Sequence, residues 1–320
     1  MESLRPSRPI LTCLLGIGVV SLCLLAVSAQ SAGSPAPAPI IQAPALDNLL
    51  AVSISAIEPD TNTETTPAVH AALRSDVAFV QNMKTSAVLY EKNADKVQPI
   101  ASISKLMTAL LIVQSGLPMD EVLEITSDDI DRLRHSRSRL RVGSRLDRST
   151  MLHLALMSSE NRAAHALART WPGGEVAFVR AMNDQARALG MRHTTFVEPT
   201  GLSSDNVSSP RDLVKLLRAS SHEPLIHQFT TDDRETVDIG QGRTLRYLNS
   251  NRLVRRGDWD IRISKTGFIN EAGECLVMLA RIGRQDLAII LLDSQGRYSR
   301  VKDAVQVRSL IKKHPALAMM

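Results

Sequence analysis

Ser102 and Lys105 stand three residues apart at the head of the apolar run "PIASISKLMTAL". Positions i and i+3 of a helix share a face, so the hydroxyl and the amine would point the same way. A serine beside a neutral amine is a nucleophile with its general base, the chemistry of acyl transfer through a covalent intermediate. A start of the helix at Ser102 would add the partial positive charge of a helix N-terminus, which favours an oxyanion there.

The four-residue spacing alone does not identify a site. Ser299 and Lys302, and likewise Ser309 and Lys312, repeat it near the C-terminus. These pairs lie on an expected terminal helix whose charged face most simply meets water, and Ser309 is far from any helix N-terminus. The neighbouring motifs must therefore separate Ser102 and Lys105 from the two later pairs.

Two further motifs follow in the chain. Ser159 and Asn161 form a Ser-x-Asn in a region of helical character, and Lys265, Thr266 and Gly267 form a Lys-Thr-Gly in a β-prone segment. Singly, the first is usually a helix cap and the second a strand end or turn. Enzymes that react with penicillin combine Ser-x-x-Lys, Ser-Asp-Asn and Lys-Thr-Gly. The same order here predicts one cleft built from three remote segments.

With the surrounding segments, the chain resembles the low-molecular-mass penicillin-binding proteins that are D,D-peptidases. The resemblance runs from about residue 77 to the C-terminal helix. It includes the approach to the nucleophile at 93–102 and the run at 182–202, with its Leu-Gly-Met and Thr-Phe pairs. The segments "SSENRAA", "NSNRL" and "SKTGFINEAGECL" are more similar to the penicillin-binding protein 7 type, which are D-alanyl-D-alanine endopeptidases.

The resemblance implies a catalytic role for each polar residue of the first two motifs. Ser102 would attack a D-alanyl carbonyl and form an acyl-enzyme. Lys105 must be neutral to accept the serine proton, so its pKa must fall from about 10.4 toward ~7–8 through burial and a neighbouring cation such as Lys265. Ser159 would pass a proton toward the leaving amine. Asn161 would orient Lys105 and the substrate amide.

The third motif is expected to bind the substrate. Lys265 would attract its negative charge, and Thr266 would hold a carboxylate through its hydroxyl. Gly267 lacks a side chain, so an extended peptide can lie against the strand edge. By analogy with the family, the backbone N–H groups of Ser102 and Phe268 would form the oxyanion hole.

A second triplet, Ser204-Asp205-Asn206, spells the family consensus better than Ser159-Glu160-Asn161 does. It sits in "GLSSDNVSSP", where Ser, Asp and Asn are expected in turns without any catalytic function. The family's second motif lies in the helical part, upstream of the Leu-Gly-Met run. We therefore predict that Ser159 and Asn161 belong to the site and that 204–206 is a turn.

Three other functions would use similar residues. A D,D-carboxypeptidase would remove a terminal D-alanine with the same groups. A β-lactamase would also need a base for water, and Glu198 lies in the expected region without the Leu-Asn signature that should follow. Intact Ser102, Lys105 and Lys265 argue against a non-catalytic penicillin sensor, although binding alone could use the same pocket. We therefore expect an endopeptidase that acts on peptidoglycan peptides and is inhibited covalently by β-lactams.

Charge and composition limit the other partners. The net charge of +5 is modest and aromatic residues make up only 3% of the chain, so a nucleic-acid partner is not expected. The eight histidines form no close ligand pair, so neither a metal nor another cofactor is expected. The segment 132–148 contains seven arginines. It is interpreted as a solvated loop or hairpin, with the alternative that it holds anionic peptidoglycan.

The first 29 residues predict export to the periplasm. Arg5 and Arg8 precede an apolar stretch, and Val27-Ser-Ala29 offers a cleavage site, although an uncleaved anchor is the alternative. Residues 30–75, rich in Pro, Ala, Ser and Thr, are predicted to be a disordered tether, which allows peripheral association with membrane or sacculus. After cleavage Cys275 alone remains, so no internal disulfide is expected.

The expected elements bring both ends of the domain into one sheet. β-prone runs at 77–80 and 87–90 suggest a hairpin. Further strands are expected at 261–264, 275–281 and 287–292, and helices at 102–114, 149–157, 175–189 and 210–217. A final amphipathic helix would contain Tyr298, Val301, Val305 and Ile311. This order predicts an α+β catalytic domain at 76–315, an antiparallel sheet flanked by helices with a helical subdomain inserted at about 117–220. The resemblance implies the same transpeptidase-like fold.

Overall fold

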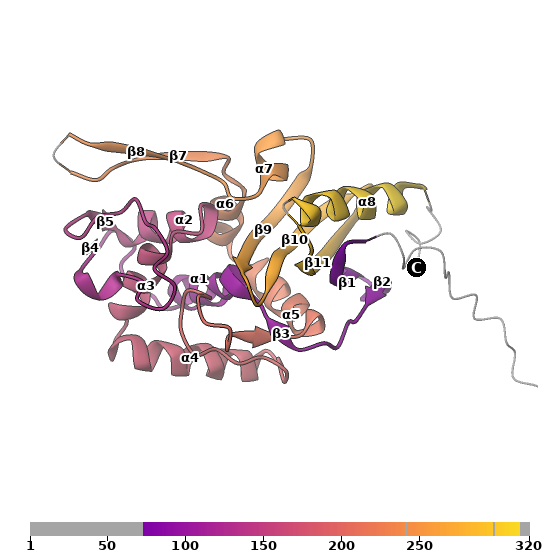
Figure 1. Cartoon of the computed structure of the whole chain (residues 1–320), viewed down its shortest axis with the longest axis horizontal. Coiled ribbons are helices and arrows are strands. Elements are labelled where there is room, and N and C mark those ends of the chain that lie inside the picture. Colours follow the sequence, from indigo (N-terminus) through magenta and orange to yellow (C-terminus); the bar gives the residue numbers. More distant parts are fainter. Residues whose placement is uncertain (1–72, 241, 297, 314–320) are drawn as a thin grey trace, which may run out of the picture. The chain divides into compact units, whose positions relative to one another are not determined.

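The computed structural model describes residues 73–240, 242–296 and 298–313, and its centre is an antiparallel sheet (Figure 1). The strand order is β2-β1-β11-β10-β9, so the first two strands join the last three. The strands are β1 (Ser75–Asn82), β2 (Val88–Lys92), β9 (Asp260–Ile269), β10 (Gly273–Ile282) and β11 (Gln285–Ser294). The predicted α+β class, with its sheet assembled from distant segments, is confirmed.

Alternation of side chains along the strands gives the sheet two apolar faces. Val277 and Ile290 belong to the larger core, whereas their neighbours Met278 and Ile289 point to the smaller core on the opposite face. Helix α8 (Ser299–Lys313) covers the smaller core. The final helix buries Ala304, Val307 and Ile311 and leaves Tyr298 and Val305 exposed, so the predicted apolar stripe was only partly right.

The larger core lies between the other face of the sheet and the helices of the central region. Helix α1 (Lys105–Gln114) is almost wholly buried in this core, behind a 3₁₀ turn, η1 (Ala101–Ser104). The remaining helices are α2 (Arg148–Met157), α3 (Asn161–Arg169), α4 (Gly174–Ala188), α5 (Pro210–Ser220), α6 (Pro224–Thr231) and α7 (Arg252–Arg256). Helices α3, α6 and α7 were not predicted.

Three short antiparallel ladders complete the fold. Strand β3 (Gln98–Pro99) pairs with β6 (Val207–Ser208), and β4 (Val122–Glu124) pairs with β5 (Arg145–Asp147). The third ladder is a hairpin of β7 (Arg234–Asp238) and β8 (Thr244–Leu248), which extends from the helical region (Figure 1). The sequence analysis predicted none of these ladders.

Two local expectations need correction. Ser102 lies in the 3₁₀ turn and α1 begins at Lys105, so the predicted helix start was three residues early. The helix predicted at 149–157 begins at Arg148, and its cap is Asp147, whose carboxylate accepts the Thr150 N–H.

The predicted signal segment 1–29 and residues 30–72 of the predicted tether lie outside the described residues. Both segments stay predictions, as do the limits of the catalytic domain. In the part of the chain that the structure describes, no helix has the length and apolar character needed to cross a bilayer.

Candidate active site

The central group of the site is the amine of Lys105, whose side chain is buried at the start of α1. Its Nζ atom lies 3.0 Å from Ser102 Oγ, 2.7 Å from Asn161 Oδ1 and 2.5 Å from the backbone oxygen of Thr200. The 3₁₀ turn puts Ser102 and Lys105 on one side, as the spacing predicted. Asn161 is the first residue of α3, so three separate segments surround one amine.

Burial lowers the pKa of Lys105 to about 8, because an ammonium loses its hydration inside the protein. The negative charges of Glu198, Glu160 and Asp131 act in the opposite direction and limit the fall. Burial is the cause that lowers the pKa of Lys105, and the predicted repulsion between the two lysines lowers the pKa of Lys265 instead.

The three partners of Lys105 differ in what they can do. Asn161 Oδ1 and Thr200 O are acceptors only, whereas the Ser102 hydroxyl can donate as well as accept. A neutral amine has two N–H groups and one lone pair. If both N–H groups go to the two obligate acceptors, the lone pair faces Ser102 and can take its proton. The arrangement is therefore suited to a general base.

Ser159 lies in the turn between α2 and α3. Its backbone φ of 62° is in the left-handed region. Its Oγ accepts a hydrogen bond of 2.8 Å from Lys265 Nζ, which also donates to Thr266 O at 2.9 Å. Asn161 Nδ2 donates to Ser136 Oγ at 3.0 Å, which fixes the amide so that its oxygen faces Lys105. The strained backbone and the paired amide hold Ser159 and Asn161 in place.

Lys265 is as deeply buried as Lys105. Burial lowers its pKa well below the ordinary lysine value, and the positive charges of Lys105 and Arg300 lower it further. Two ammonium groups so close together oppose each other, because each disfavours the charged form of the other. A bound anion would relieve this repulsion and favour the charged form.

Strand β9 presents Thr266, Gly267 and Phe268 along its edge beside the nucleophile. A Cβ atom on Gly267 would lie 3.0 Å from Ser102 N and from Ile100 O, so only glycine lets the strand approach this closely. Thr266 Oγ1 donates to Ser250 Oγ at 2.6 Å. Phe268 is exposed at the rim of a cleft of about 570 Å³ that is also lined by Ser102, Ser159 and Asn161.

Two residues of the cleft region, Arg300 and Glu198, have roles that the sequence did not predict; Glu198 was weighed only as the water base of a β-lactamase. Arg300, on α8, lines the cleft and donates to Gly267 O at 2.6 Å, and Glu274 balances its charge at 2.7 Å. Glu198 accepts hydrogen bonds from the backbone N–H groups of Thr200 and Gly201, both at 2.6 Å. This carboxylate thereby shapes the loop that presents Thr200 O to Lys105.

The triplet 204–206 is a turn, as predicted, but its last residue has a structural role. Asn206 is fully buried, and its side-chain oxygen accepts from Val197 N at 2.7 Å. Its amide donates to Ser104 Oγ at 3.0 Å and to Glu198 Oε1 at 2.9 Å. Asn206 therefore ties the Glu198 loop to the turn that contains the nucleophile.

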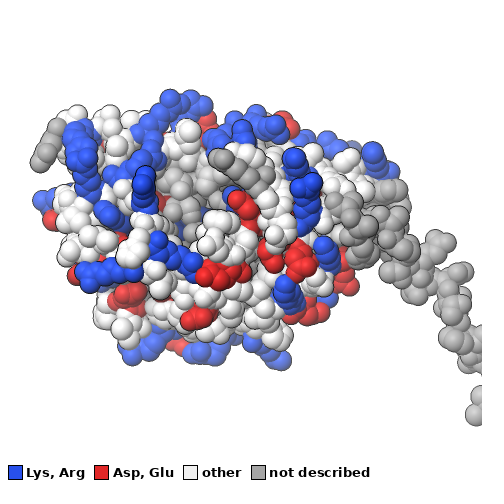
Figure 2. Space-filling view, in the orientation of Figure 1, with Lys and Arg blue, Asp and Glu red and all other residues white. Residues whose placement is uncertain are grey.

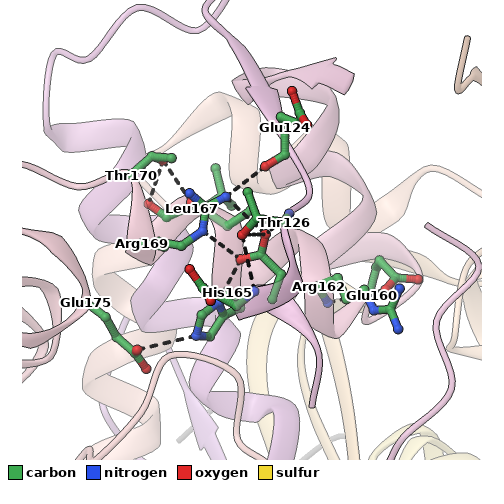
Figure 3. A network of polar contacts seen from close by, with 12 residues as sticks. Glu124, Thr126, Glu160, Arg162, His165, Leu167, Arg169, Thr170 and Glu175 are labelled. Atoms are coloured by element: carbon green, nitrogen blue, oxygen red, sulfur yellow. Dashed lines mark hydrogen bonds and ion pairs between the residues drawn. The ribbon is translucent and has the colours of Figure 1, made fainter. Parts of the chain in front are cut away.

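Behind the cleft, helix α3 is fixed by a network of ionic contacts (Figure 3). Asp129, whose carboxylate is wholly buried, accepts from Arg169 Nε at 3.0 Å and lies 2.8 Å from His165 Nδ1. The other ring nitrogen of His165 faces Glu175 at 3.3 Å. Burial lowers the pKa of His165, but its bonds to the two carboxylates outweigh this and raise it to about 9. A charged imidazole thus holds the helix that begins with Asn161.

The arginine segment 132–148 is not uniformly solvated, which corrects the simple interpretation. Arg148 is buried and paired with Glu121. Arg134 lines the cleft, donates to Leu202 O and pairs with Glu271 at 2.8 Å. The other five arginines are exposed: Arg132, Arg137, Arg139, Arg141 and Arg145. Within the described residues, no group of three His, Cys, Asp or Glu side chains is arranged to hold a metal ion.

An antiparallel sheet with a helical insertion and a Ser-Lys pair in the cleft between them define a serine enzyme of the acyl-transfer class. The family model described as D-alanyl-D-alanine carboxypeptidase matches residues 61–296. The chain therefore belongs to this family of serine peptidases, and the resemblance found in the sequence is confirmed.

Relatives within the family are similar over most of the chain. A D-alanyl-D-alanine endopeptidase of Pseudomonas aeruginosa is 50% identical over 237 residues, which are 74% of this chain and 76% of that protein. A D-alanyl-D-alanine endopeptidase of Escherichia coli K12 is 45% identical over 248 residues, 77% of this chain and 80% of that protein.

Solved structures share the fold. The DD-transpeptidase of Streptomyces K15 has a TM-score of 0.69 at 27% identity, covering 74% of this chain and 96% of its own. Penicillin-binding protein D2 of Listeria monocytogenes, in its cefotaxime-bound form, has a TM-score of 0.66 at 31% identity with the same coverage. The predicted penicillin-binding fold is thereby confirmed.

Proposed function

We propose that the protein is a serine D,D-endopeptidase that hydrolyses D-alanyl cross-links in peptidoglycan through an acyl-enzyme on Ser102. The observation that supports the chemistry most directly is the Lys105 amine, 3.0 Å from Ser102 Oγ and held by two obligate acceptors. The endopeptidase specificity is supported by the two relatives at 50% and 45% identity, both named endopeptidases. Relatives near 30% identity are named carboxypeptidases, so that activity is the alternative.

In the first step Ser102 Oγ attacks the D-alanyl carbonyl carbon while its proton passes to Lys105 Nζ. The negative charge that develops on the carbonyl oxygen is stabilised by the backbone N–H groups of Ser102 and Phe268. The close approach of Gly267 to Ser102 N supports this role, since it brings the strand beside the nucleophile turn.

In the second step the C–N bond breaks and the leaving amine takes a proton from Ser159 Oγ. Ser159 then regains the proton that Lys105 took from Ser102, so Lys105 is neutral again. Water then attacks the acyl-enzyme while Lys105 accepts one of its protons. The bond between Ser102 Oγ and the acyl carbon breaks, Ser102 takes that proton from Lys105, and the shortened peptide leaves with its new carboxylate.

The third motif would bind the carboxylate that the substrate presents on the leaving side of the scissile bond. Thr266 and Arg300 line the cleft, the buried Lys265 amine lies 2.8 Å from Ser159 Oγ, and Arg300 supplies positive charge. Binding of this carboxylate favours the charged form of Lys265. The repulsion between the two lysines then favours the neutral form of Lys105, so substrate binding itself prepares the base.

β-Lactams would acylate Ser102 as covalent inhibitors, a role supported by the family and by the cefotaxime-bound relative. The place of action would be the periplasm, with residues 1–29 as the export signal and peripheral contact with the sacculus or membrane. No metal or other cofactor takes part in the proposed reaction.

Digestion of purified muropeptides tests the proposal. We expect cross-linked dimers to disappear with the wild-type protein and to persist with Ser102→Ala, which removes the nucleophile. Shortening of pentapeptides with dimers intact would instead establish carboxypeptidase activity. A β-lactam that still bound covalently to Ser102→Ala would overturn the mechanism, because no acyl group could form at that position.

A further inference from the structure

Three exposed arginines from two distant segments line one surface hollow. Arg141 belongs to the loop that leads into β5, Arg145 is the first residue of β5, and Arg243 follows the tip of the β7–β8 hairpin. Together with Gly240 they border a cavity of about 480 Å³. Among the residues that the structure describes, none forms a hydrogen bond or an ion pair with these three side chains.

The two segments are fastened to each other near this hollow. Arg139 donates from Nη1 to Arg246 O at 2.6 Å, and its guanidinium lies 3.7 Å above the centroid of the Tyr247 ring. Tyr247 is buried in the larger core. The loop is thus anchored to the hairpin, and the hollow has a defined shape.

Positive charge strongly exceeds negative charge around the hollow. Residues 132–148 and 234–248 together contain ten arginines and three carboxylates, those of Asp147, Glu235 and Asp238. Three of these arginines, Arg134, Arg148 and Arg234, are paired with carboxylates outside the two segments. Asp147 caps α2, and Asp238 accepts from Gly240 N at 2.8 Å. Lys and Arg gather over the hairpin in Figure 2. Unpaired guanidinium groups that line one hollow repel, so this surface favours an anionic partner.

The hollow lies within reach of the catalytic cleft. Ser136 lines the cleft and Arg141 follows it by five residues, so their Cα atoms are separated by at most about 18 Å. An extended peptide of about five residues has the same length. A strand whose cross-link occupies the cleft can therefore reach the hollow with its adjoining stem peptide.

We propose that Arg141, Arg145 and Arg243 form a subsite for free carboxylates of the peptidoglycan strand that adjoins the cross-link in the cleft. Guanidinium groups bind carboxylates through paired, planar hydrogen bonds, which suits a hollow of this size. The inference rests on the proposed function and adds to it a reason for preferring polymeric cell wall over isolated peptides.

The test compares two triple variants that change the net charge equally. The first is Arg141→Glu, Arg145→Glu and Arg243→Glu. The matched control is Arg180→Glu, Arg192→Glu and Arg284→Glu, three exposed arginines without hydrogen bonds or ion pairs in the described part of the chain. Binding to lipid-free sacculi is measured by pelleting at low and raised salt. Acylation by a fluorescent β-lactam reports on folding and on the intact nucleophile.

We expect the first triple variant to weaken sacculus binding by about tenfold or more, as reversal of three charges implies. Wild-type binding should fall as salt is raised. The control should bind like the wild type, and all three proteins should acylate within about twofold of one another. Equal binding by the first variant, or equal loss in the control, would overturn the proposal.

Two further measurements distinguish the carboxylate subsite from a membrane-binding surface and from a failure of the proposed function. Vesicles of phosphatidylglycerol and phosphatidylcholine test a membrane partner. Loss of vesicle binding by the first triple variant, with its sacculus binding unchanged, would overturn the proposed subsite. Digestion of muropeptide dimers by the wild-type protein tests the proposed function itself. If dimers persist while sacculus binding still depends on the three arginines, the proposed function fails and the carboxylate subsite stands.

Discussion

Lys265 Nζ donates a hydrogen bond of 2.8 Å to Ser159 Oγ, although 106 residues separate the two in the chain. The contact joins the third motif to the second and places an N–H donor beside a hydroxyl. A hydroxyl polarised in this way gives up a proton more readily, as transfer to a leaving amine requires. Ser159 also has a φ of 62°, in the left-handed region. Different substitutions can therefore test the role of the hydroxyl and the cost of this backbone conformation separately.

We expect Ser159→Ala and Ser159→Gly to lower kcat for cross-link hydrolysis alike, by roughly 10²-fold or more, because both lack the hydroxyl. Their stabilities should differ. Glycine adopts a positive φ without strain, so Ser159→Gly should be more stable than Ser159→Ala by about 1 kcal/mol. Turnover assays and calorimetry give the two quantities. Normal turnover by the glycine variant would show that the hydroxyl is dispensable.

The acylation rate should depend on pH through Lys105. Its pKa of about 8 means that the ammonium form predominates below that pH and the neutral base above it. The second-order rate of acylation by a β-lactam should therefore rise with pH and level off above about 9. Lys105→Arg should lose about 10²–10⁴-fold at every pH, since guanidinium remains charged. A flat wild-type profile between pH 6 and 9 would contradict the role of Lys105.

The Ser102 and Lys105 pair was predictable because its geometry is local. Three residues of helix or 3₁₀ turn put both side chains on one side, whatever the rest of the fold. The meeting of Ser159 with Lys265 is not local, and only the resemblance to a family indicated it. Spacing along a chain does not determine which remote segments pack together.

The parts that escaped prediction have weak local signals. The hairpin strands "RETVD" and "TLRYL" bury few side chains, mainly Val237 and Tyr247, so their alternation is faint. Gly240 and Gly242 lie between the two runs, and a glycine pair there indicates a hairpin turn, but no hairpin was predicted from it. Glu198 acts through hydrogen bonds to backbone groups of an irregular loop, and no residue pattern predicts such contacts.

Substitution of Glu198 distinguishes the contribution of its hydrogen bonds to stability from the effect of its charge on the pKa of Lys105. Glu198→Gln keeps the shape but replaces one acceptor oxygen by a donor, which leaves loop N–H groups unpaired and should cost about 1–3 kcal/mol of stability. The carboxylate also raises the pKa of Lys105. Its removal should therefore shift the midpoint of the acylation profile to lower pH. A purely structural role would lower the rate without moving that midpoint.

Gly201 tests how tightly this loop packs against the nucleophile turn. Its φ is +81°, and a Cβ atom there would lie 1.9 Å from Ala101 O. We expect Gly201→Ala to destabilise the protein by several kcal/mol or to abolish β-lactam acylation, since backbone must move. Gly116→Ala is the matched control, because its φ is +72° but its Cβ would meet nothing within 4 Å. Similar losses in both variants would mean that strain in φ, and not the contact, is responsible.

The network behind α3 predicts a pH-dependent part of the stability. The folded pKa of His165 is raised to about 9, above the ordinary value of 6.5, so the stabilisation is fully present below pH 6.5 and is lost as the pH rises through about 9. This difference corresponds to on the order of 3 kcal/mol. His165→Gln should therefore cost most at pH 6 and little at pH 9.5.

Lys105 contributes with the opposite sign, because its lowered pKa makes folding more favourable as the pH rises from about 8 toward 10.5. The useful quantity is therefore the difference in unfolding free energy between wild type and His165→Gln at each pH, in which the Lys105 contribution cancels. That difference should shrink between pH 6.5 and 9. A difference that stayed constant over this range would mean that the imidazole is neutral in the folded protein, and that Arg169 alone balances the buried Asp129.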